Sequence, residues 1–288
     1  MHDTTTDLLA PPRGHHRRHG AGVSPGSAFA AAVLPVTAQT QVRTGSSGLA
    51  AGAVTIPVGD FKMPAYRAMP AGTSHLPVVL VVSEIFGVHE HIADVARRLA
   101  RQGYLAIAPQ LFERQGDAGS YTDIGKLIVE VVSRTPDAQV MADLDACVAW
   151  AREQGGDTSR LGITGFCWGG RIVWMYAAHN PALMAGVAWY GPVARSYAAG
   201  DPCAIEVAPR IKAPMLGLYG GDDGGIPNDT LEQMRAALKA SGNTRSEIVL
   251  YADTPHAFHA DYRPSYRKEA ADDGWRRCLA WLKSHGVA

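Results

Sequence analysis

Residues 160–170 read Arg-Leu-Gly-Ile-Thr-Gly-Phe-Cys-Trp-Gly-Gly, an apolar strand that runs directly into the pattern Gly-x-Cys-x-Gly and then into an apolar helix. This arrangement is typical of a nucleophile elbow, a sharp strand-to-helix turn that holds its central residue in a strained backbone conformation. Glycine is expected at positions 165 and 169 because a side chain there would collide with the neighbouring chain. The segment therefore predicts an α/β fold with Cys167 as the nucleophile of the turn.

The position of Cys167 also predicts reactivity. At the N-terminus of the following helix, the positive end of the helix dipole favours the thiolate, which is the reactive form. The alternative is that the string arises by chance and that Cys167 is a structural thiol, since free cysteines are usually buried. The motif alone leaves both interpretations open.

The rest of the chain after about residue 50 alternates short apolar runs with amphipathic segments, as expected for a mostly parallel sheet covered by helices. Helices are predicted around 92–100, over 139–153, from the N-cap Asn228 onward, and around Trp275 at the end of the chain. No repeat or long linker divides residues 51–288, so we expect one domain. The predicted strands are 77–82, 104–108, 160–164, 185–189, 215–219 and 247–251.

Composition narrows the class of partner. The 288 residues carry 27 basic and 27 acidic side chains, a formal net charge of zero. This balance does not suggest nucleic acid or an anionic membrane surface, and a small-molecule ligand fits better. Cys147, Cys167, Cys203 and Cys278 show no C-x-x-C pair and no metal-ligand spacing, so neither a metal site nor a disulfide scaffold is expected. The helical pattern places Cys147 and Cys278 in the core.

The first 50 residues differ from the rest, because Pro, Gly, His, Ala, Ser and Thr dominate. Arg17-Arg18 precedes the modest apolar stretch 28–36, and residues 36–38 offer the small side chains that a signal peptidase accepts. The segment resembles a twin-arginine export signal, which predicts a periplasmic or secreted protein beginning near Gln39. The alternative is a cytoplasmic protein with a disordered N-terminal tail. No apolar run reaches the roughly 20 residues of a membrane span.

Two further loops supply the acid and the base that a nucleophilic cysteine needs. The glycine-rich loop 220–227 follows a predicted strand and contains Asp222 and Asp223, and spacing does not separate these two carboxylates. His256 lies on the loop before the last helix, with His259 as the local rival. The chain order of nucleophile, acid and base, each after a strand, is that of an α/β catalytic triad.

Four segments together now point to a family: 83–88 (Ser-Glu-Ile-Phe-Gly-Val), 165–170, 221–227 and 256–258. They resemble the dienelactone hydrolase family, and the resemblance covers most of residues 51–288. It implies an α/β-hydrolase fold, with a mostly parallel central sheet, helices on both faces and no large cap, and it implies no cofactor. In that family the catalytic aspartate lies four residues before the proline of its loop, which points to Asp223.

The resemblance also assigns roles near the nucleophile. Glu84 matches a family glutamate that pairs with the resting thiol and gives way when substrate enters, so the resemblance implies that Glu84 is a catalytic residue that activates the thiol. The backbone N–H groups of Ile85 and Trp168 would form the oxyanion hole.

Substrate binding is the least defined part of the resemblance. Arg114 matches a family arginine that helps to hold the substrate carboxylate. The second family arginine is absent, because Ala260 occupies its position, with His259 and Arg263 nearby. We take His259 as a further substrate-binding residue. Because a histidine does not replace the bidentate clamp of an arginine, the preferred substrate need not be a dienelactone.

We therefore expect acyl transfer from an ester or lactone to Cys167, with His256, held by Asp223, activating the water that releases the acid. A general carboxylesterase or thioesterase with the same triad is the nearest alternative. A non-catalytic binding protein on the same fold is another. A redox-sensing thiol would need a resolving cysteine such as Cys203. The sequence does not distinguish a monomer from a homodimer.

Overall fold

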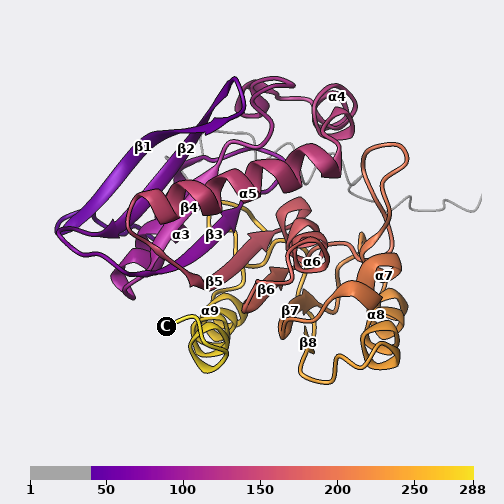
Figure 1. Ribbon diagram of the computed structural model, residues 1–288. Coiled ribbons are helices and arrows are strands. Elements are labelled where there is room, and N and C mark those ends of the chain that lie inside the picture. Colours follow the sequence, from indigo (N-terminus) through magenta and orange to yellow (C-terminus); the bar gives the residue numbers. More distant parts are fainter. Residues whose placement is uncertain (1–39) are drawn as a thin grey trace, which may run out of the picture.

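One eight-stranded sheet forms the central layer of the fold, with helices packed around it (Figure 1). The computed structural model describes residues 40–288. The strand order is β1-β2-β4-β3-β5-β6-β7-β8, with β1 and β2 antiparallel and the others parallel from β4 onward. The strands are β1 (Leu49–Val58), β2 (Phe61–Pro70), β3 (Pro77–Val82), β4 (Leu105–Pro109), β5 (Asp157–Phe166), β6 (Ala185–Trp189), β7 (Met215–Gly220) and β8 (Glu247–Tyr251).

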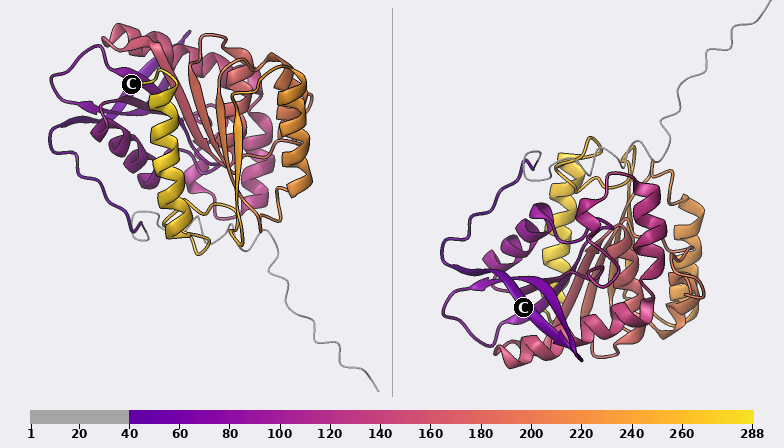
Figure 2. Two further views of the ribbon diagram at one scale, coloured as in Figure 1. Left: turned by 90° about the horizontal axis from the view of Figure 1, so that it is seen from below. Right: turned by 90° about the horizontal axis from the view of Figure 1, so that it is seen from above.

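Helices cover both faces of the sheet. In Figure 2, α3 and α9 lie on one face and α5, α6 and α8 on the other. A strand covered on both faces has no solvent side, and the central strands β3, β4, β6 and β7 are accordingly buried along their whole length. The helices are α3 (Glu90–Arg101), α4 (Ile124–Glu130), α5 (Asp137–Glu153), α6 (Trp168–His179), α7 (Ala204–Val207), α8 (Asn228–Ala240) and α9 (Lys268–Ser284).

The predicted α/β architecture is confirmed. The apolar runs at β3, β6 and β8 fall on the predicted residues, and the other predicted strands and helices are present with shifted ends. One local prediction is wrong: Asn228 is the first residue of α8, and Pro227 takes the N-cap position without a side-chain hydrogen bond. Proline at this place gives the extended backbone that a helix start needs, so Asn228 is not required as a cap. Cys147 and Cys278 are buried in the core as predicted.

The hairpin of β1 and β2 is an element that the sequence did not reveal. Most residues of β1 are half-buried, and its run Leu-Ala-Ala-Gly-Ala lacks the alternation that marks a strand. The turn between the strands contains Gly59 at φ 57°, a conformation that glycine adopts without strain. The predicted boundary at residue 50 therefore falls inside β1 and is corrected by the structure.

The segment before β1 is also part of the folded domain. The backbone N–H groups of Gln41 and Val42 donate to Asp261, at 2.8 and 2.5 Å, and that of Thr44 donates to Asp94. Asp261 in turn lies 2.9 Å from His91 of α3, and both side chains are buried. Residues 40–45, which we call the N-terminal tether, thus hold the loop that follows β8. The twin-arginine-like segment and the predicted cleavage before Gln39 lie outside the described residues.

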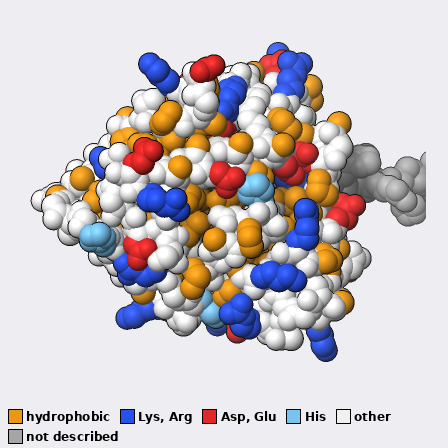
Figure 3. Space-filling model, viewed as in Figure 1, with side chains coloured by type: hydrophobic (Ala, Val, Ile, Leu, Met, Phe, Trp, Pro, Cys, Tyr) orange, Lys and Arg blue, Asp and Glu red, His pale blue; other side chains and the backbone are white. Residues whose placement is uncertain are grey.

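No helix within residues 40–288 is long and apolar enough to cross a bilayer. On the face shown in Figure 3, basic and acidic side chains are interspersed among hydrophobic ones. This face therefore presents no large field of one sign.

Asp261→Ala should lower the free energy of unfolding by about 3 kcal/mol, because it leaves the N–H groups of the tether and the buried ring of His91 without their charged acceptor. Urea unfolding measures the change. The control is Asp272→Ala, which removes only an exposed ion pair with Lys268 and should change stability by less than about 0.5 kcal/mol. Equal stabilities of the two variants would show that the tether contributes nothing to the fold.

Candidate active site

The turn between β5 and α6 has the geometry of a nucleophile elbow. Cys167 is the N-cap of α6 and has φ 58° and ψ −119°, a conformation that is costly for a side-chain-bearing residue. A Cβ atom on Gly165 would lie 2.4 Å from the carbonyl oxygen of Gly169, and one on Gly169 would lie 2.3 Å from that of Val82. The predicted requirement for glycine on both sides of Cys167 is confirmed, because the backbones touch where side chains would be.

His256 and Asp223 form a hydrogen-bonded series with this cysteine. His256 follows β8 and places Nε2 at 3.3 Å from the Sγ atom of Cys167. Its Nδ1 atom lies 2.5 Å from Oδ2 of Asp223, which follows β7. The other oxygen of Asp223 accepts a hydrogen bond from the backbone of Gly225. Asp222, by contrast, is exposed and bonds to the chain through its backbone N–H.

The electrostatics of this series favour a charged imidazole. Burial lowers the pKa of His256, but Cys167 and Asp223 outweigh it and raise this pKa from its usual 6.5 to about 9. The Asp223 side chain is only 1% exposed, so its charge is little screened by solvent. A charged imidazole beside a thiol favours the thiolate, which is the reactive form of a cysteine nucleophile.

Two tyrosines border the site. Tyr190 packs edge-on against the ring of His256, with the ring centroids 5.1 Å apart. It has φ 37°, and burial, together with the charges of Glu84 and Cys167, raises the pKa of its hydroxyl well above the usual value. Burial and Cys167 also raise the pKa of Tyr197. Both phenols therefore stay neutral and can offer a hydrogen bond but no charge.

The backbone groups expected to form the oxyanion hole belong to residues that follow the ends of β3 and β5. Ile85 directly follows Glu84 beyond β3, and Trp168 opens α6. Within residues 40–288, neither N–H donates to another group. A free N–H at a helix N-terminus beside the nucleophile is suited to a developing oxyanion.

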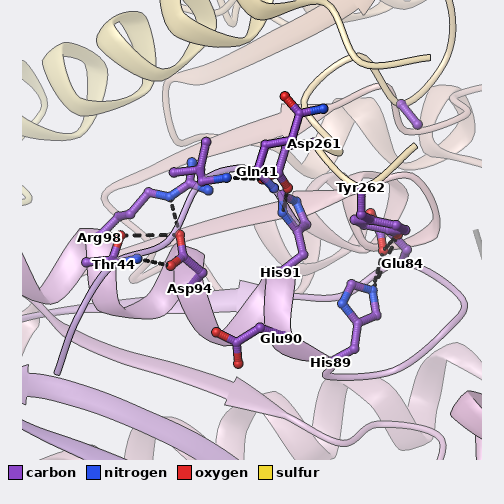
Figure 4. A network of polar contacts seen from close by, with 12 residues as sticks. Gln41, Thr44, Glu84, His89, Glu90, His91, Asp94, Arg98, Asp261 and Tyr262 are labelled. Atoms are coloured by element: carbon purple, nitrogen blue, oxygen red, sulfur yellow. Dashed lines mark hydrogen bonds and ion pairs between the residues drawn. The ribbon is translucent and has the colours of Figure 1, made fainter. Parts of the chain in front are cut away.

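Glu84 does not pair with the thiol, contrary to the expectation. Its Oε2 atom accepts hydrogen bonds from the ring of His89 at 2.8 Å and from the hydroxyl of Tyr262 at 2.7 Å (Figure 4). Burial alone would raise the pKa of Glu84, but His89, His91 and Tyr262 lower it from 4.5 to about 2. The buried carboxylate is therefore ionised and held by its own donors.

The two residues expected to bind substrate have other partners. Arg114 forms a bidentate ion pair with Asp143 of α5 at 2.8 and 2.9 Å and lies over the ring of Phe61. His259 is 2% exposed and packs against Phe166 and Trp189, and burial lowers its pKa well below the usual value. With its pKa lowered in this way, the His259 ring is a weaker base than His256 and offers no charge to a substrate.

His89 and Tyr262 were missed by sequence reasoning. Tyr262 lies in the loop between β8 and α9 that also carries His256, and His89 is the N-cap of α3. Neither follows a periodic pattern, and the only signal was their place in loops at the carboxyl ends of strands, where sites are built.

Within residues 40–288 the structure contains no group of three or more His, Cys, Asp or Glu side chains that could hold a metal ion. All four cysteines are free thiols, Cys203 among them.

Comparison with known proteins identifies what the chain resembles. The sequence profile of the "Dienelactone hydrolase family" matches residues 63–286. A protein of Methylorubrum extorquens described as "Putative carboxymethylenebutenolidase" is 57% identical over 274 residues, covering 94% of each chain. A protein of Escherichia coli K12 with the same description is 52% identical and covers 90% of this chain and 96% of its own.

Solved structures agree with these sequences. A crystal structure described as "Putative Dienelactone Hydrolase" from Klebsiella pneumoniae is 55% identical, with a TM-score of 0.79, and covers 82% of this chain and 98% of its own. A dienelactone hydrolase-like phosphotriesterase from metagenomic libraries is 22% identical, with a TM-score of 0.66, and covers 83% of this chain and 99% of its own. At this lower identity the likeness shows the fold alone.

The charge state of His256 gives a test by NMR. Its ring should titrate near pH 9 in the wild-type protein and distinctly lower in Cys167→Ala, because the cysteine is the leading group that raises its pKa. Following the ring carbon shifts with selectively labelled histidine measures both values. A wild-type titration near 6.5 would contradict the thiolate and imidazolium pair.

The raised pKa of His256 also makes the free energy of unfolding depend on pH. A pKa that is higher in the folded state means that folding binds a proton, so this contribution is complete below about pH 6.5 and is lost as pH rises towards 9. The loss over that range should be smaller in Cys167→Ala, where the pKa of His256 is less raised.

Proposed function

Since the chain belongs to the dienelactone hydrolase family, we propose that it hydrolyses a carboxylic ester or a lactone with Cys167 as the nucleophile. The observation that carries the proposal is the hydrogen-bonded series from Asp223 through His256 to Cys167, placed on a strained turn. Nucleophile, base and orienting acid within bonding distance are the requirements of covalent acyl transfer. No cofactor is needed for this reaction.

Acylation begins with the Cys167 thiolate attacking the carbonyl carbon. The carbonyl oxygen takes the negative charge and is stabilised by the N–H groups of Ile85 and Trp168. When the tetrahedral intermediate collapses, the bond between carbon and the ester oxygen breaks, and His256 gives its proton to the leaving alkoxide. A lactone opens in the same step, and its alcohol end stays attached to the acyl group.

Deacylation uses the same groups in reverse. His256, now neutral, removes a proton from water as the water oxygen attacks the thioester carbon. The carbon–sulfur bond then breaks, the acid leaves, and the thiolate and imidazolium pair is restored. Asp223 keeps the proton of Nδ1 in place, which leaves Nε2 free to act as the base.

A second function has a specific observation in its favour. Arg114 is neutralised by Asp143, and Ala260 replaces the second arginine that the family resemblance leads us to expect. A substrate with its own carboxylate would therefore lack the paired clamp that fixes it bidentately. This favours a carboxylesterase of broader scope, acting on uncharged acyclic esters through the same triad.

Cys167→Ala should lower kcat/KM on an aryl ester by at least about a thousandfold, because a triad without its nucleophile loses the covalent route. Cys203→Ala is the matched control, since it removes a half-buried thiol outside the triad and should retain activity. Steady-state hydrolysis, with circular dichroism to confirm folding, measures both.

Full activity of Cys167→Ala would remove the proposed nucleophile. Loss of activity in Cys203→Ala as well would favour a redox role for the second thiol. If the wild type cleaves neither esters nor lactones, the non-catalytic binding protein becomes the better interpretation.

A substrate comparison separates the two proposed activities. With the carboxylate clamp incomplete, an uncharged aryl ester should be hydrolysed with a higher kcat/KM than a dienelactone, whose carboxylate needs a cation. A strong preference for the dienelactone would show that the site binds a carboxylate by other means.

A further inference from the structure

The ends of β3 and β5 bring Glu84 beside the nucleophile. The two strands are parallel, and Val82 pairs with Gly165. Glu84 and Cys167 each follow two residues later, so they leave neighbouring strands at the same level of the sheet. Strands in a sheet lie about 4.8 Å apart, and the backbone of Ser83 touches Gly169 just beyond the cysteine. A Glu84 side chain turned towards Cys167 would therefore be within reach of the thiol.

The structure holds this carboxylate elsewhere. Both hydrogen bonds of Glu84 go to one oxygen, Oε2, and come from His89 and Tyr262. The two donors also contact each other, with ring centroids 5.1 Å apart in an edge-on arrangement. Oε1 is buried and has no hydrogen-bond partner within residues 40–288. The position of the side chain thus depends on two donors at one oxygen.

Tyr262 is fixed by its neighbour in sequence. Asp261 accepts hydrogen bonds from the N–H groups of Gln41 and Val42 and also bonds to His91. Asp261 directly precedes Tyr262 on the same loop (Figure 4). The ring of His91 also packs against Tyr262, at 5.4 Å between centroids. The hydroxyl that reaches Glu84 is therefore held by the N-terminal tether and α3, not by the active-site residues.

We propose that His89 and Tyr262 are positioning residues that keep the Glu84 carboxylate away from Cys167, so that the thiol is paired with His256 before substrate arrives. The inference rests on the proposed function, since it concerns the readiness of that nucleophile. A carboxylate is a strong acceptor, and a thiol that donates to it keeps its proton. With Glu84 held by its own donors, the imidazole 3.3 Å from Sγ is the hydrogen-bonded partner of the thiol.

The proposed resting state differs from the family expectation in the partner of the thiol, which is His256 and not Glu84. Where a glutamate pairs with the thiol, substrate must displace it before the nucleophile forms. Here the displaced arrangement is present without substrate, at the cost of a buried carboxylate that needs both donors. Cys167 should consequently react with an uncharged alkylating reagent, because no substrate carboxylate is needed to displace Glu84 first.

The test measures the thiolate directly. In a Cys203→Ser background, which removes the half-buried thiol, the rate of alkylation of Cys167 by iodoacetamide and the thiolate absorbance near 240 nm are followed over a pH series. Tyr262→Phe should reduce the alkylation rate at neutral pH about tenfold, equivalent to one pH unit in the profile, because the released carboxylate competes for the thiol proton. An unchanged rate and profile would overturn the proposal.

Tyr121→Phe is the matched control. It also removes a tyrosine hydroxyl that donates to a glutamate, but the bond to Glu130 is exposed. The alkylation rate should stay at the wild-type value. For the second donor, His89→Gln keeps an N–H for Glu84 and should retain most of the thiolate, whereas His89→Leu should lose it. Equal behaviour of the two His89 variants would contradict a role through Glu84.

Glu84→Gln separates positioning from general packing and does not depend on the folding of the tyrosine variant. On its own, Glu84→Gln should leave the thiolate fraction within about twofold of wild type, because the Glu84 carboxylate is not bonded to the resting thiol. A tenfold rise in the thiolate fraction would show that the carboxylate is bonded to the thiol in the wild type. In this background Tyr262→Phe should have little further effect, as expected for coupled residues. An undiminished effect would assign Tyr262 to packing and overturn the proposal.

Failure of this inference is distinct from failure of the proposed function. Alkylation needs no ester, so the thiolate readout stands whether or not a substrate is cleaved. If Cys167→Ala loses hydrolysis while Tyr262→Phe keeps the wild-type thiolate profile, only the positioning role is wrong. If Cys167→Ala retains hydrolysis, the proposed function itself is wrong.

Discussion

The backbone contact between the start of α6 and the end of β3 is the constraint on which the rest of the structure depends. Glycine at 169 lets the first turn of α6 rest on the carbonyl groups of Val82 and Ser83, and glycine at 170 does the same against the turn after β6. No other residue fits, since any Cβ would overlap backbone atoms. This contact forces Cys167 into a positive φ at the edge of the sheet, where the loops carrying Asp223 and His256 converge. It also brings the end of β3, with Glu84, beside the nucleophile.

The charges around that contact are divided into separate pairs. Cys167, His256 and Asp223 form one series, and Glu84 has its own donors in His89 and Tyr262. In a buried site of low dielectric an ion without a partner is expensive, and one with the wrong partner loses its function. The separation explains why the pKa of His256 is raised to about 9 while that of Glu84 falls to about 2, although both groups are buried beside one thiol. Reactivity here depends as much on which groups are kept apart as on which groups meet.

The sequence was informative where one local requirement dominates. Buried parallel strands need continuous apolar runs, so β3 and β6 could be placed on the predicted residues, and an elbow needs glycine, so Cys167 stood out. Asp222 and Asp223 could not be separated by spacing, because only the turn geometry decides which carboxylate faces His256. The β1–β2 hairpin escaped notice because its half-buried residues follow no clean alternation. The tether and its acceptor Asp261 could not be foreseen, since backbone donors leave no mark on the identity of their own residues.

The division between constrained and unconstrained residues bears on how such a site changes its substrate. In the proposed mechanism, attack, oxyanion stabilisation and water activation use the elbow, two backbone N–H groups and two loop side chains, all at the edge of the sheet. The residues expected to recognise a carboxylate lie outside that framework: Arg114 is held by Asp143 of α5, and position 260 carries alanine in a chain whose triad residues are within bonding distance. An α/β fold can therefore keep acyl transfer while its substrate class changes, because the two tasks depend on different parts of the chain. The bonds of Glu84 belong to the same argument, since a nucleophile that does not wait for a substrate carboxylate suits a site with an incomplete carboxylate clamp.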